Sequence, residues 1–201
     1  MSSVNGKIDI RFNNSLQNID GLSNISSIGG HLLIDGNNVL ENIDGLSNLT
    51  SIDNYITIAD NPMLENINGL NSITYVAVKL NIYNNNSLIN LEGLNNIVSI
   101  NGNLGIGDNI SLSNIDALVG ITTVDGNLQV ARNNSLTNLN GLSNINSLSR
   151  NLYIVENYSL TNLCGLQSLL PLAGGYDTSY YVHDNGYNPT EQDIIDGNCS
   201  L

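Results

Sequence analysis

Residues 37–60, with the sequence NNVLENIDGLSNLTSIDNYITIAD, decide the fold of this chain because the same pattern returns every 24 residues. Full copies begin at Asn13, Asn37, Asn61, Asn85, Asn109 and Asn133. A seventh copy begins at Asn157 and carries a four-residue insertion around residues 173–179, and residues 4–12 match the last part of a copy, a half coil. Recurrence at a fixed period of this length is the signature of a repeat architecture and outweighs local propensity.

Two spacings of apolar residues divide each repeat into a strand and a return segment. Leu32 and Ile34 are two positions apart, as in a short strand with one buried face. From Leu16 to Ile28 the apolar residues follow at every third position, which fits tight turns or 3-10 pieces better than an α-helix. Because the strand recurs once per repeat, we expect parallel strands stacked about 4.8 Å apart. Stacking then buries the apolar face that one repeat cannot bury alone.

Two asparagine columns run through the repeats. We expect the column that closes each strand to point inward and to bridge successive turns as an asparagine ladder, since buried amides must be satisfied. Its members are Asn13, Asn37, Asn61, Asn85, Asn109, Asn133, Asn157 and Asn185. The second column, which includes Asn18 and Asn42, is expected to cap the return turn. Gly45 and its equivalents, with Ala117 as the exception, are expected to need a close backbone approach or a positive φ.

Composition and charge restrict the possible function classes. The formal net charge is −13 and the chain has five Lys and Arg residues, so we expect no nucleic-acid partner, which would need clustered basic residues. The 38 asparagines alternate with Leu and Ile at fixed spacing, which indicates packing rather than disorder. No window approaches the roughly 18 apolar residues of a membrane span. We expect a secreted or cell-surface protein whose signal peptide is not part of this sequence.

The C-terminal segment is expected to cap the array. The sequence NPTE at residues 188–191 is typical of a helix start, with Asn188 as the N-cap and Pro189 in the first helical position. Ile194 and Ile195 can then cover the end of the core. We therefore assign residues 1–187 to the repeat array and residues 188–201 to a C-terminal cap.

Cys164 and Cys199 are the only cysteines, and they are 35 positions apart. We expect them to form a disulfide that staples the cap to the last repeat, because an exported protein permits such a bond. Two unrelated buried thiols are the alternative. A structural zinc site is disfavoured, because two cysteines without a CxxC motif or paired histidines do not supply four ligands.

The pattern LxIxxN followed by xxLxNIxGLxNIxxI resembles leucine-rich repeat proteins, in particular the bacterial internalin-like kind and the related receptor L-domain-like repeats. Residues 58–67, IADNPMLENI, and residues 82–91, IYNNNSLINL, carry the match, which extends from residue 4 to about residue 185. The resemblance implies a curved, right-handed solenoid with a parallel sheet on one face and 3-10 or irregular segments on the other. Glycine stands here where internalins often have proline, and no internalin-type helical N-terminal cap is visible.

The expected fold class is therefore an α/β-type repeat solenoid, mostly β. In detail we expect a right-handed leucine-rich repeat solenoid of about eight 24-residue coils, with one parallel sheet, irregular convex segments and a short C-terminal capping helix. Proteins of this family bind proteins or glycans, and some have no known ligand.

The outward-facing strand positions vary whereas the core positions do not, so we expect the exposed sheet face to carry binding specificity. Tyr153, Tyr181 and His183, with Tyr83 further along the array, form the best candidate cluster, because exposed tyrosine offers contact area and a hydroxyl. The alternative is that these tyrosines only cover strand edges near the cap. The full set of candidate binding residues is Thr57, Asn81, Tyr83, Gln129, Arg132, Tyr153, Tyr181 and His183.

No catalytic, metal or cofactor site is expected. Asp60, Asp108, Glu156 and Asp184 follow strands, but alternate coils are about 9.6 Å apart by the strand spacing. This separation is too large for a retaining glycosidase pair and near the upper limit for an inverting one. We expect these carboxylates to be solvated, with no basic group placed to assist them.

These observations predict a noncatalytic binding module, extracellular or at the cell surface, that recognises a protein or a glycan through the exposed sheet face. A polysaccharide-acting β-helix enzyme is an alternative, since coils of this length also suit that fold. Ice binding is a third reading and needs a repetitive column of Thr or similar residues. The central outward column instead mixes Asp, Leu, Thr, Asn, Gly, Gln and Tyr, which disfavours ice binding.

Overall fold

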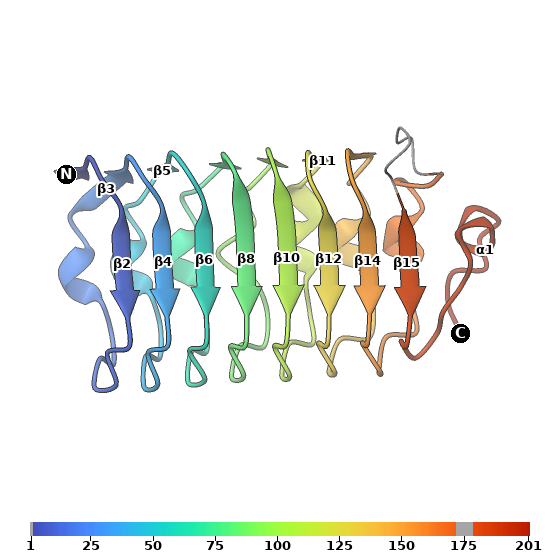
Figure 1. Cartoon of the computed structure of the whole chain (residues 1–201), viewed down its shortest axis with the longest axis horizontal. Coiled ribbons are helices and arrows are strands. Elements are labelled where there is room, and N and C mark those ends of the chain that lie inside the picture. Colours follow the sequence, from blue (N-terminus) through green and yellow to red (C-terminus); the bar gives the residue numbers. More distant parts are fainter. Residues whose placement is uncertain (1, 172–178) are drawn as a thin grey trace.

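The computed structural model describes residues 2–171 and 179–201. In this part of the chain, eight parallel strands form the main sheet and follow one another in sequence order (Figure 1). The strands are β2 (Ile8–Arg11), β4 (Leu32–Asp35), β6 (Ile56–Ala59), β8 (Lys79–Tyr83), β10 (Asn103–Gly107), β12 (Leu128–Ala131), β14 (Leu152–Val155) and β15 (Tyr180–His183). The insertion expected around residues 173–179 lies outside the described residues except for its last member.

Each strand of the main sheet pairs with the equivalent strand of the next repeat. Leu32 lies opposite Ile56 and Ile34 lies opposite Ile58, so the register follows the 24-residue period. Burial alternates along β4 and β6, where Leu32, Ile34, Ile56 and Ile58 are fully buried. This is the arrangement that a two-residue apolar step predicts. The expected parallel-sheet solenoid is confirmed.

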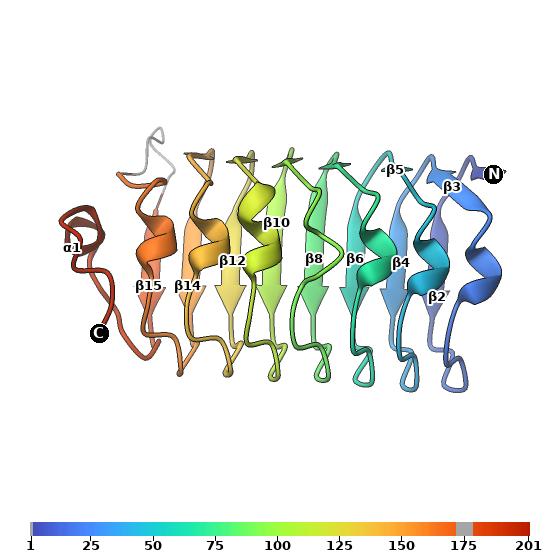
Figure 2. The same cartoon turned by 180° about the vertical axis from the view of Figure 1, so that it is seen from behind.

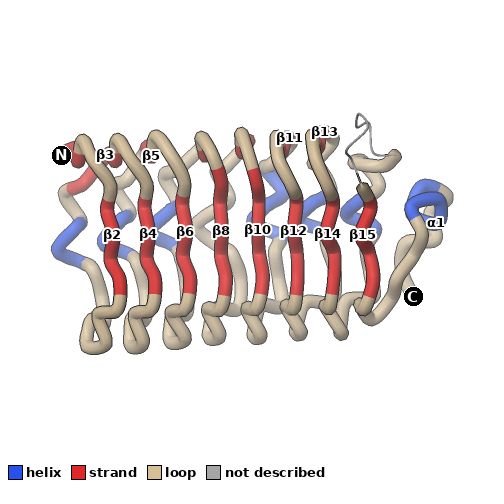
Figure 3. The backbone as a smooth tube through the Cα atoms, viewed as in Figure 1, coloured by secondary structure: helices blue, strands red, loops and turns tan. Residues whose placement is uncertain are grey.

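The expectation of a single sheet is wrong, because the return segments form two smaller parallel sheets (Figure 3). Where neighbouring returns run extended side by side, their backbone groups can pair between coils, which satisfies donors and acceptors that would otherwise lie beside the core. One sheet contains β1 (Ser2–Val4), β3 (Ile25–Ile28) and β5 (Ser51–Ile52). The other contains β7 (Tyr75–Val76), β9 (Ser99–Ile100), β11 (Thr123–Val124) and β13 (Ser147–Leu148).

Short 3-10 helices form the side opposite the main sheet (Figure 2). They are η1 (Asp20–Leu22), η2 (Asp44–Leu46), η3 (Asn68–Leu70), η4 (Asp116–Gly120), η5 (Asn140–Leu142) and η6 (Cys164–Leu166). The asparagine two positions before the first residue of each helix caps it through its side chain. Asn18 Oδ1, for example, accepts from the Asp20 N–H at 3.3 Å, and Asn42 Oδ1 accepts from the Asp44 N–H at 3.2 Å. None of the helices in the described ranges is long and apolar enough to cross a membrane.

The glycine column is explained by close approach of successive coils. A β-carbon at Gly45 would overlap the Ile19 carbonyl oxygen of the preceding coil, and one at Gly69 would overlap that of Ile43. Gly93 is the member of this column with a positive φ, 107°. In its repeat the return forms a turn instead of a 3-10 helix. Left-handed geometry is therefore needed at one place, whereas close approach recurs along the column.

The asparagine ladder crosses the coils beside the ends of the main strands. Asn109, which is fully buried, accepts from the Asn85 N–H at 3.0 Å and donates through Nδ2 to the Ile82 carbonyl at 3.0 Å. Its own N–H donates to Asn133 Oδ1 at 3.2 Å. Asn13 departs from the expected burial, because it is exposed although it donates to Asn37. It lies on the outermost coil, where no described neighbour covers it.

The C-terminal helix α1 (Glu191–Ile195) begins two residues later than the sequence predicts. Its N-cap is Thr190, whose hydroxyl accepts from the Asp193 N–H while the Asp193 carboxylate accepts from the Thr190 N–H. Asn188 is not the N-cap, because its side chain has another role. Asn188 Oδ1 accepts from the backbone N–H of Asn185 at 2.9 Å and from its Nδ2 at 3.0 Å. The side chain therefore ends the ladder by taking the position of the next rung.

The cap packs on the last coil beyond β15 (Figure 1). Ile194 of α1 is fully buried. A disulfide joins Cys164, at the start of η6, to Cys199, with 4.9 Å between the α-carbons. The backbone also pairs here, since the Leu163 N–H donates to the Cys199 carbonyl at 2.8 Å.

Candidate functional site

The exposed face of the main sheet contains a hollow of about 200 Å³ centred on β10. Side chains from four neighbouring strands or their ends contribute to it. Its lining residues are Asn81, Tyr83, Asn103, Leu104, Gly105, Asn127, Gln129 and Tyr153. The hollow therefore brings together four of the candidate residues predicted from the sequence. The first and last of them, Asn81 and Tyr153, are 72 positions apart in the chain.

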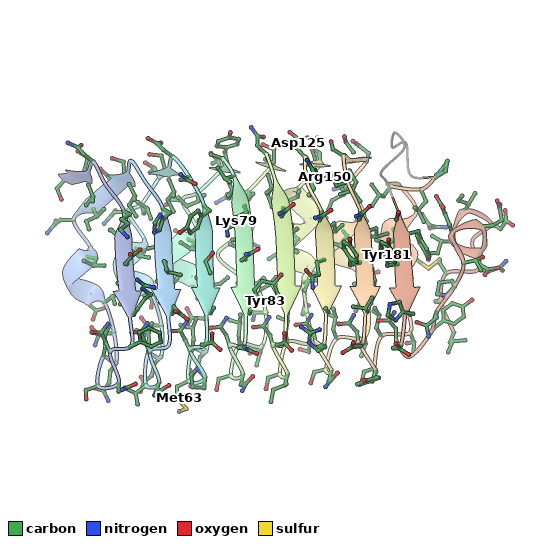
Figure 4. All side chains as sticks on the ribbon, viewed as in Figure 1. Met63, Lys79, Tyr83, Asp125, Arg150 and Tyr181 are labelled. Carbon is green, nitrogen blue, oxygen red and sulfur yellow. A yellow bond between two sulfur atoms is a disulfide. The ribbon has the colours of Figure 1, made fainter. Side chains whose placement is uncertain are left out.

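Tyr83 forms one wall of this hollow and lies across the two glycines of β10. A β-carbon at Gly105 would overlap the Tyr83 hydroxyl, and one at Gly107 would lie 2.6 Å from a ring carbon. The hydroxyl continues to β12, where it donates to Gln129 Oε1 at 3.4 Å. Tyr83 thus extends from β8 to β12 because the intervening strand has no side chains at these positions. Figure 4 shows it on the sheet between β8 and β10.

The polar walls of the hollow are amides with unused donors. The Asn103 and Asn127 carbonyls accept from the next coil's backbone, at Asn127 N–H (2.8 Å) and Asn151 N–H (3.1 Å). Their NH₂ groups, that of Gln129 and the whole Asn81 side-chain amide have no hydrogen-bond partner among the described residues. Each NH₂ group can donate two bonds. The hollow therefore offers several uncharged donors to a ligand.

A stacked tyrosine pair borders the hollow on the C-terminal side. The rings of Tyr153 and Tyr181 have centroids 4.8 Å apart and an interplanar angle of 2°. The Tyr153 hydroxyl accepts from Asn151 Nδ2 at 2.8 Å, which fixes the ring beside the hollow. Tyr181 is 42% exposed, so one face of the pair remains open to solvent. A pair of this kind provides a flat aromatic platform.

The charged groups at the ends of β10, β12 and β14 form a small network of one arginine and two carboxylates. Arg132 donates to both carboxylate oxygens of Asp108, at 2.6 and 2.8 Å, and its other nitrogen lies 3.9 Å from Glu156. These hydrogen bonds raise the pKa of Arg132. Burial raises the pKa of the Tyr83 phenol, and the Asp108 carboxylate raises it further. None of the described residues that line the hollow carries a formal charge.

The expectation that no basic group lies beside the strand-end carboxylates is wrong at two of them. Arg132 pairs with Asp108, and His183 Nδ1 lies 2.8 Å from the Asp184 carboxylate. The residues after the strands have left-handed backbone, with φ of 56° at Asp108 and 55° at Arg132. Their identical geometry places equivalent side chains of successive coils side by side. Residues 24 positions apart therefore meet as pairs.

A second group of side chains, at the start of β2 to β8, was missed by the sequence interpretation. Asp9 lies 2.7 Å from the Lys7 ammonium and 2.7 Å from His31 Nε2. The Lys7 hydrogen bond lowers the pKa of Asp9, although partial burial opposes it. The His31 ring stacks on Tyr55 with centroids 4.3 Å apart, and the Lys79 ammonium lies 4.6 Å above Tyr55. Lys7, His31, Tyr55 and Lys79 occupy the same position of the repeat, directly before the first inward residue of β2, β4, β6 and β8. This shared position is the sequence pattern that could have identified the group.

The predicted candidates thus separate into two groups. Asn81, Tyr83, Gln129 and Tyr153 line the hollow, and Tyr181 stacks beside it. The remaining three lie outside it. These are Thr57 on β6, Arg132 after β12 and His183 at the end of β15.

Larger hollows lie elsewhere on the described surface, including one of about 360 Å³ between two return segments. Its lining includes Asn90 and Asn114, whose carbonyls already cap their return turns. The sheet-face hollow differs because aromatic rings border it and because the whole Asn81 side-chain amide has no hydrogen-bond partner among the described residues.

Comparison of the chain with models of protein families, with curated proteins and with solved structures finds no match.

Proposed function

We propose that this chain is a noncatalytic binding module of the leucine-rich repeat type that holds its ligand on the exposed face of the eight-stranded sheet. The observation that carries this proposal is the convergence of Asn81, Tyr83, Gln129 and Tyr153 around one hollow. Positions that vary between repeats meet there, whereas the positions that build the coils stay constant. A surface of this kind can evolve specificity without loss of the scaffold.

The leucine-rich repeat assignment, with right-handed coils and the sheet as the ligand face, rests on the LxIxxN pattern and its 24-residue period. Parallel strands on one side and 3-10 helices on the other support it. The small sheets formed by β3 and its equivalents are also compatible with a β-helix. The capped 3-10 returns favour the leucine-rich repeat type.

The pairing of Asp108 favours a binding role over a hydrolytic one. Both carboxylate oxygens of Asp108 are already engaged by hydrogen bonds from Arg132, so this side chain is held in an ion pair rather than presented to a substrate. Ice binding would need a repetitive flat column, whereas Leu33, Thr57, Asn81 and Gly105 follow one another on this face.

A secreted or cell-surface location is supported by the Cys164–Cys199 disulfide, because such bonds persist in oxidising compartments. The net charge of −13 agrees with a partner other than nucleic acid.

The test uses the purified chain, immobilised and screened against panels of glycans and of extracellular proteins. Each ligand found is then measured against Tyr153→Ala, Tyr181→Ala and a control, Thr123→Ala, on the small sheet formed by β7, β9, β11 and β13. The proposal predicts weaker binding by the two tyrosine variants and unchanged binding by the control. If Tyr153→Ala and Tyr181→Ala bind every ligand as tightly as the unaltered chain does, the sheet face around these tyrosines is not the binding surface.

A further inference from the structure

The hollow on β10 has properties that restrict what can occupy it. Its volume is about 200 Å³, smaller than the roughly 300–1,000 Å³ of pockets for drug-sized ligands. It therefore suits one ring-sized group rather than a whole small molecule. Because the hollow lies open on the sheet, a chain that carries such a group can continue across neighbouring strands.

The donors in the hollow favour a ligand rich in hydroxyl groups. The NH₂ groups of Asn103, Asn127 and Gln129 lack partners among the described residues, and so does the Asn81 amide. Hydroxyl oxygens can accept from these NH₂ groups and donate to the Asn81 carbonyl oxygen. An apolar protein side chain would leave the amides buried and unsatisfied, which is unfavourable.

The charges around the hollow favour an uncharged ligand. None of its described lining residues carries a formal charge, and Arg132, which follows β12, is paired with Asp108 and Glu156. The chain as a whole carries a net charge of −13, which repels uronic acids and sulfated sugars. The ligand should therefore be uncharged.

Aromatic rings border the same place. Tyr83 lies over the glycines of β10, and the Tyr153–Tyr181 stack stands on the other side. Sugar rings present flat faces of C–H groups, which pack on aromatic surfaces, together with equatorial hydroxyls that reach amides at the edges. Unused amides and aromatic surfaces therefore occur together, as recognition of a sugar requires.

We infer that the hollow lined by Asn81, Tyr83, Gly105 and Gln129 binds one uncharged sugar residue of a glycan, whose chain continues over the Tyr153–Tyr181 stack. This inference rests on the proposed function, because it assigns a ligand class to the same sheet face.

The experiment measures binding of the full chain to a panel of defined oligosaccharides by isothermal titration. The neutral members are gluco-, manno-, galacto- and N-acetylglucosamine oligosaccharides, and the charged members are oligogalacturonates and sulfated galactans. We expect at least one neutral oligosaccharide to bind and the charged ones to bind more weakly. Failure of every neutral member to bind at millimolar concentration would overturn the inference.

Three variants test the hollow for the neutral oligosaccharide that binds best. Asn81→Ala and Gln129→Ala should each weaken binding by about two- to tenfold, as expected for one or two lost hydrogen bonds. Gln129→Glu keeps the shape but removes the donors, so it should weaken binding at least as much as Gln129→Ala. Thr123→Ala is the control and should bind as the unaltered chain does. Thermal unfolding of each variant identifies any loss that comes from misfolding.

The outcomes separate this inference from the proposed function. If a protein ligand is lost in Tyr153→Ala and Tyr181→Ala but no neutral glycan binds, the sugar assignment is wrong and the sheet-face proposal stands. If glycan binding survives all three hollow variants but not the tyrosine variants, the sugar lies on the stack alone and the hollow is not its site. Preferential binding of the charged panel would also contradict the inference.

Discussion

The Tyr83 hydroxyl occupies the space that a β-carbon at Gly105 would need. The two residues belong to adjacent strands, β8 and β10, and the glycine lies in a strand interior. Glycine at such a position is unfavourable for the strand itself, by roughly 0.5–1 kcal/mol relative to alanine. Its presence is explained by the tyrosine, which reaches Gln129 only by passing over Gly105.

A double-mutant cycle of Tyr83→Ala and Gly105→Ala tests this relationship. In the Tyr83→Ala background, Gly105→Ala should raise the free energy of unfolding by roughly 0.5–1 kcal/mol, because the strand gains propensity. The close contact that remains, with Asn81 Oδ1 at 2.9 Å, involves the end of a side chain that can move. In the unaltered chain the same substitution should give no gain, because the tyrosine must move. Urea unfolding of the four proteins measures the coupling, which we expect to be about 1 kcal/mol. Additive effects would show that the two residues are independent.

Asn109→Ala should be strongly destabilising. It removes the acceptor for the Asn85 N–H and the donor to the Ile82 carbonyl, both in the interior. Each buried group left without a partner costs about 1–3 kcal/mol, so we expect a loss of about 3 kcal/mol in urea unfolding. Asn13→Ala is the matched control, because this rung is exposed. Equal losses at the two positions would contradict the role of burial in the ladder.

Reduction of the disulfide should destabilise the cap. Cys164 and Cys199 close a loop with a sequence separation of 35. A cross-link over this length lowers the entropy of the unfolded chain and so stabilises the folded state by about 4 kcal/mol. We expect a lower melting temperature under reducing conditions and faster hydrogen exchange in α1. The double variant Cys164→Ser, Cys199→Ser should melt like the reduced chain and should not respond to reductant. A melting temperature unaffected by reductant in the unaltered chain would refute this prediction.

Asp35→Asn should stabilise the chain at neutral pH. Burial raises the pKa of Asp35 and repulsion from Asp60 adds to the effect, while Arg11 opposes it. The folded state therefore binds a proton more readily than the unfolded state does. The stability that this proton provides is complete below the unfolded pKa of about 3.9 and is lost as the pH rises through the folded value.

The measurement for Asp35 is thermal unfolding at pH 7 and at pH 3. The advantage of Asp35→Asn should be present at pH 7 and should shrink at pH 3, where the aspartate is protonated. It should also be smaller in an Asp60→Asn background, because the repelling carboxylate is absent. An advantage of equal size at both pH values would contradict the electrostatic explanation.

Much of the fold follows from residue spacing. The step of two between Leu32 and Ile34 predicts a strand with one buried face, and the recurrence of Asn37 after 24 residues predicts the register. The small sheets could not be predicted from the spacing of apolar residues. Strands such as β5 (Ser51–Ile52) are only two residues long, and they pair because the neighbouring coils approach each other.

The candidate site was predictable as a face but not as a hollow. Column alignment identifies Asn81, Tyr83, Gln129 and Tyr153 as outward and variable. It does not show that Tyr83 lies across β10, since this depends on the missing side chains of Gly105 and Gly107. The helix start was predicted too early for a related reason. Asn188 can cap either a helix or the ladder, and only the fold decides that it serves Asn185.

The most direct test of the sheet face as the binding surface is to map the bound ligand by NMR on the ¹⁵N-labelled chain, with the neutral oligosaccharide or protein that binds most tightly. We expect the largest shifts at the side-chain NH₂ groups of Asn81 and Gln129 and at backbone amides of β8 to β14. Shifts confined to the 3-10 helices η1 to η6, with these NH₂ signals unchanged, would contradict the claim that the sheet face is the binding site.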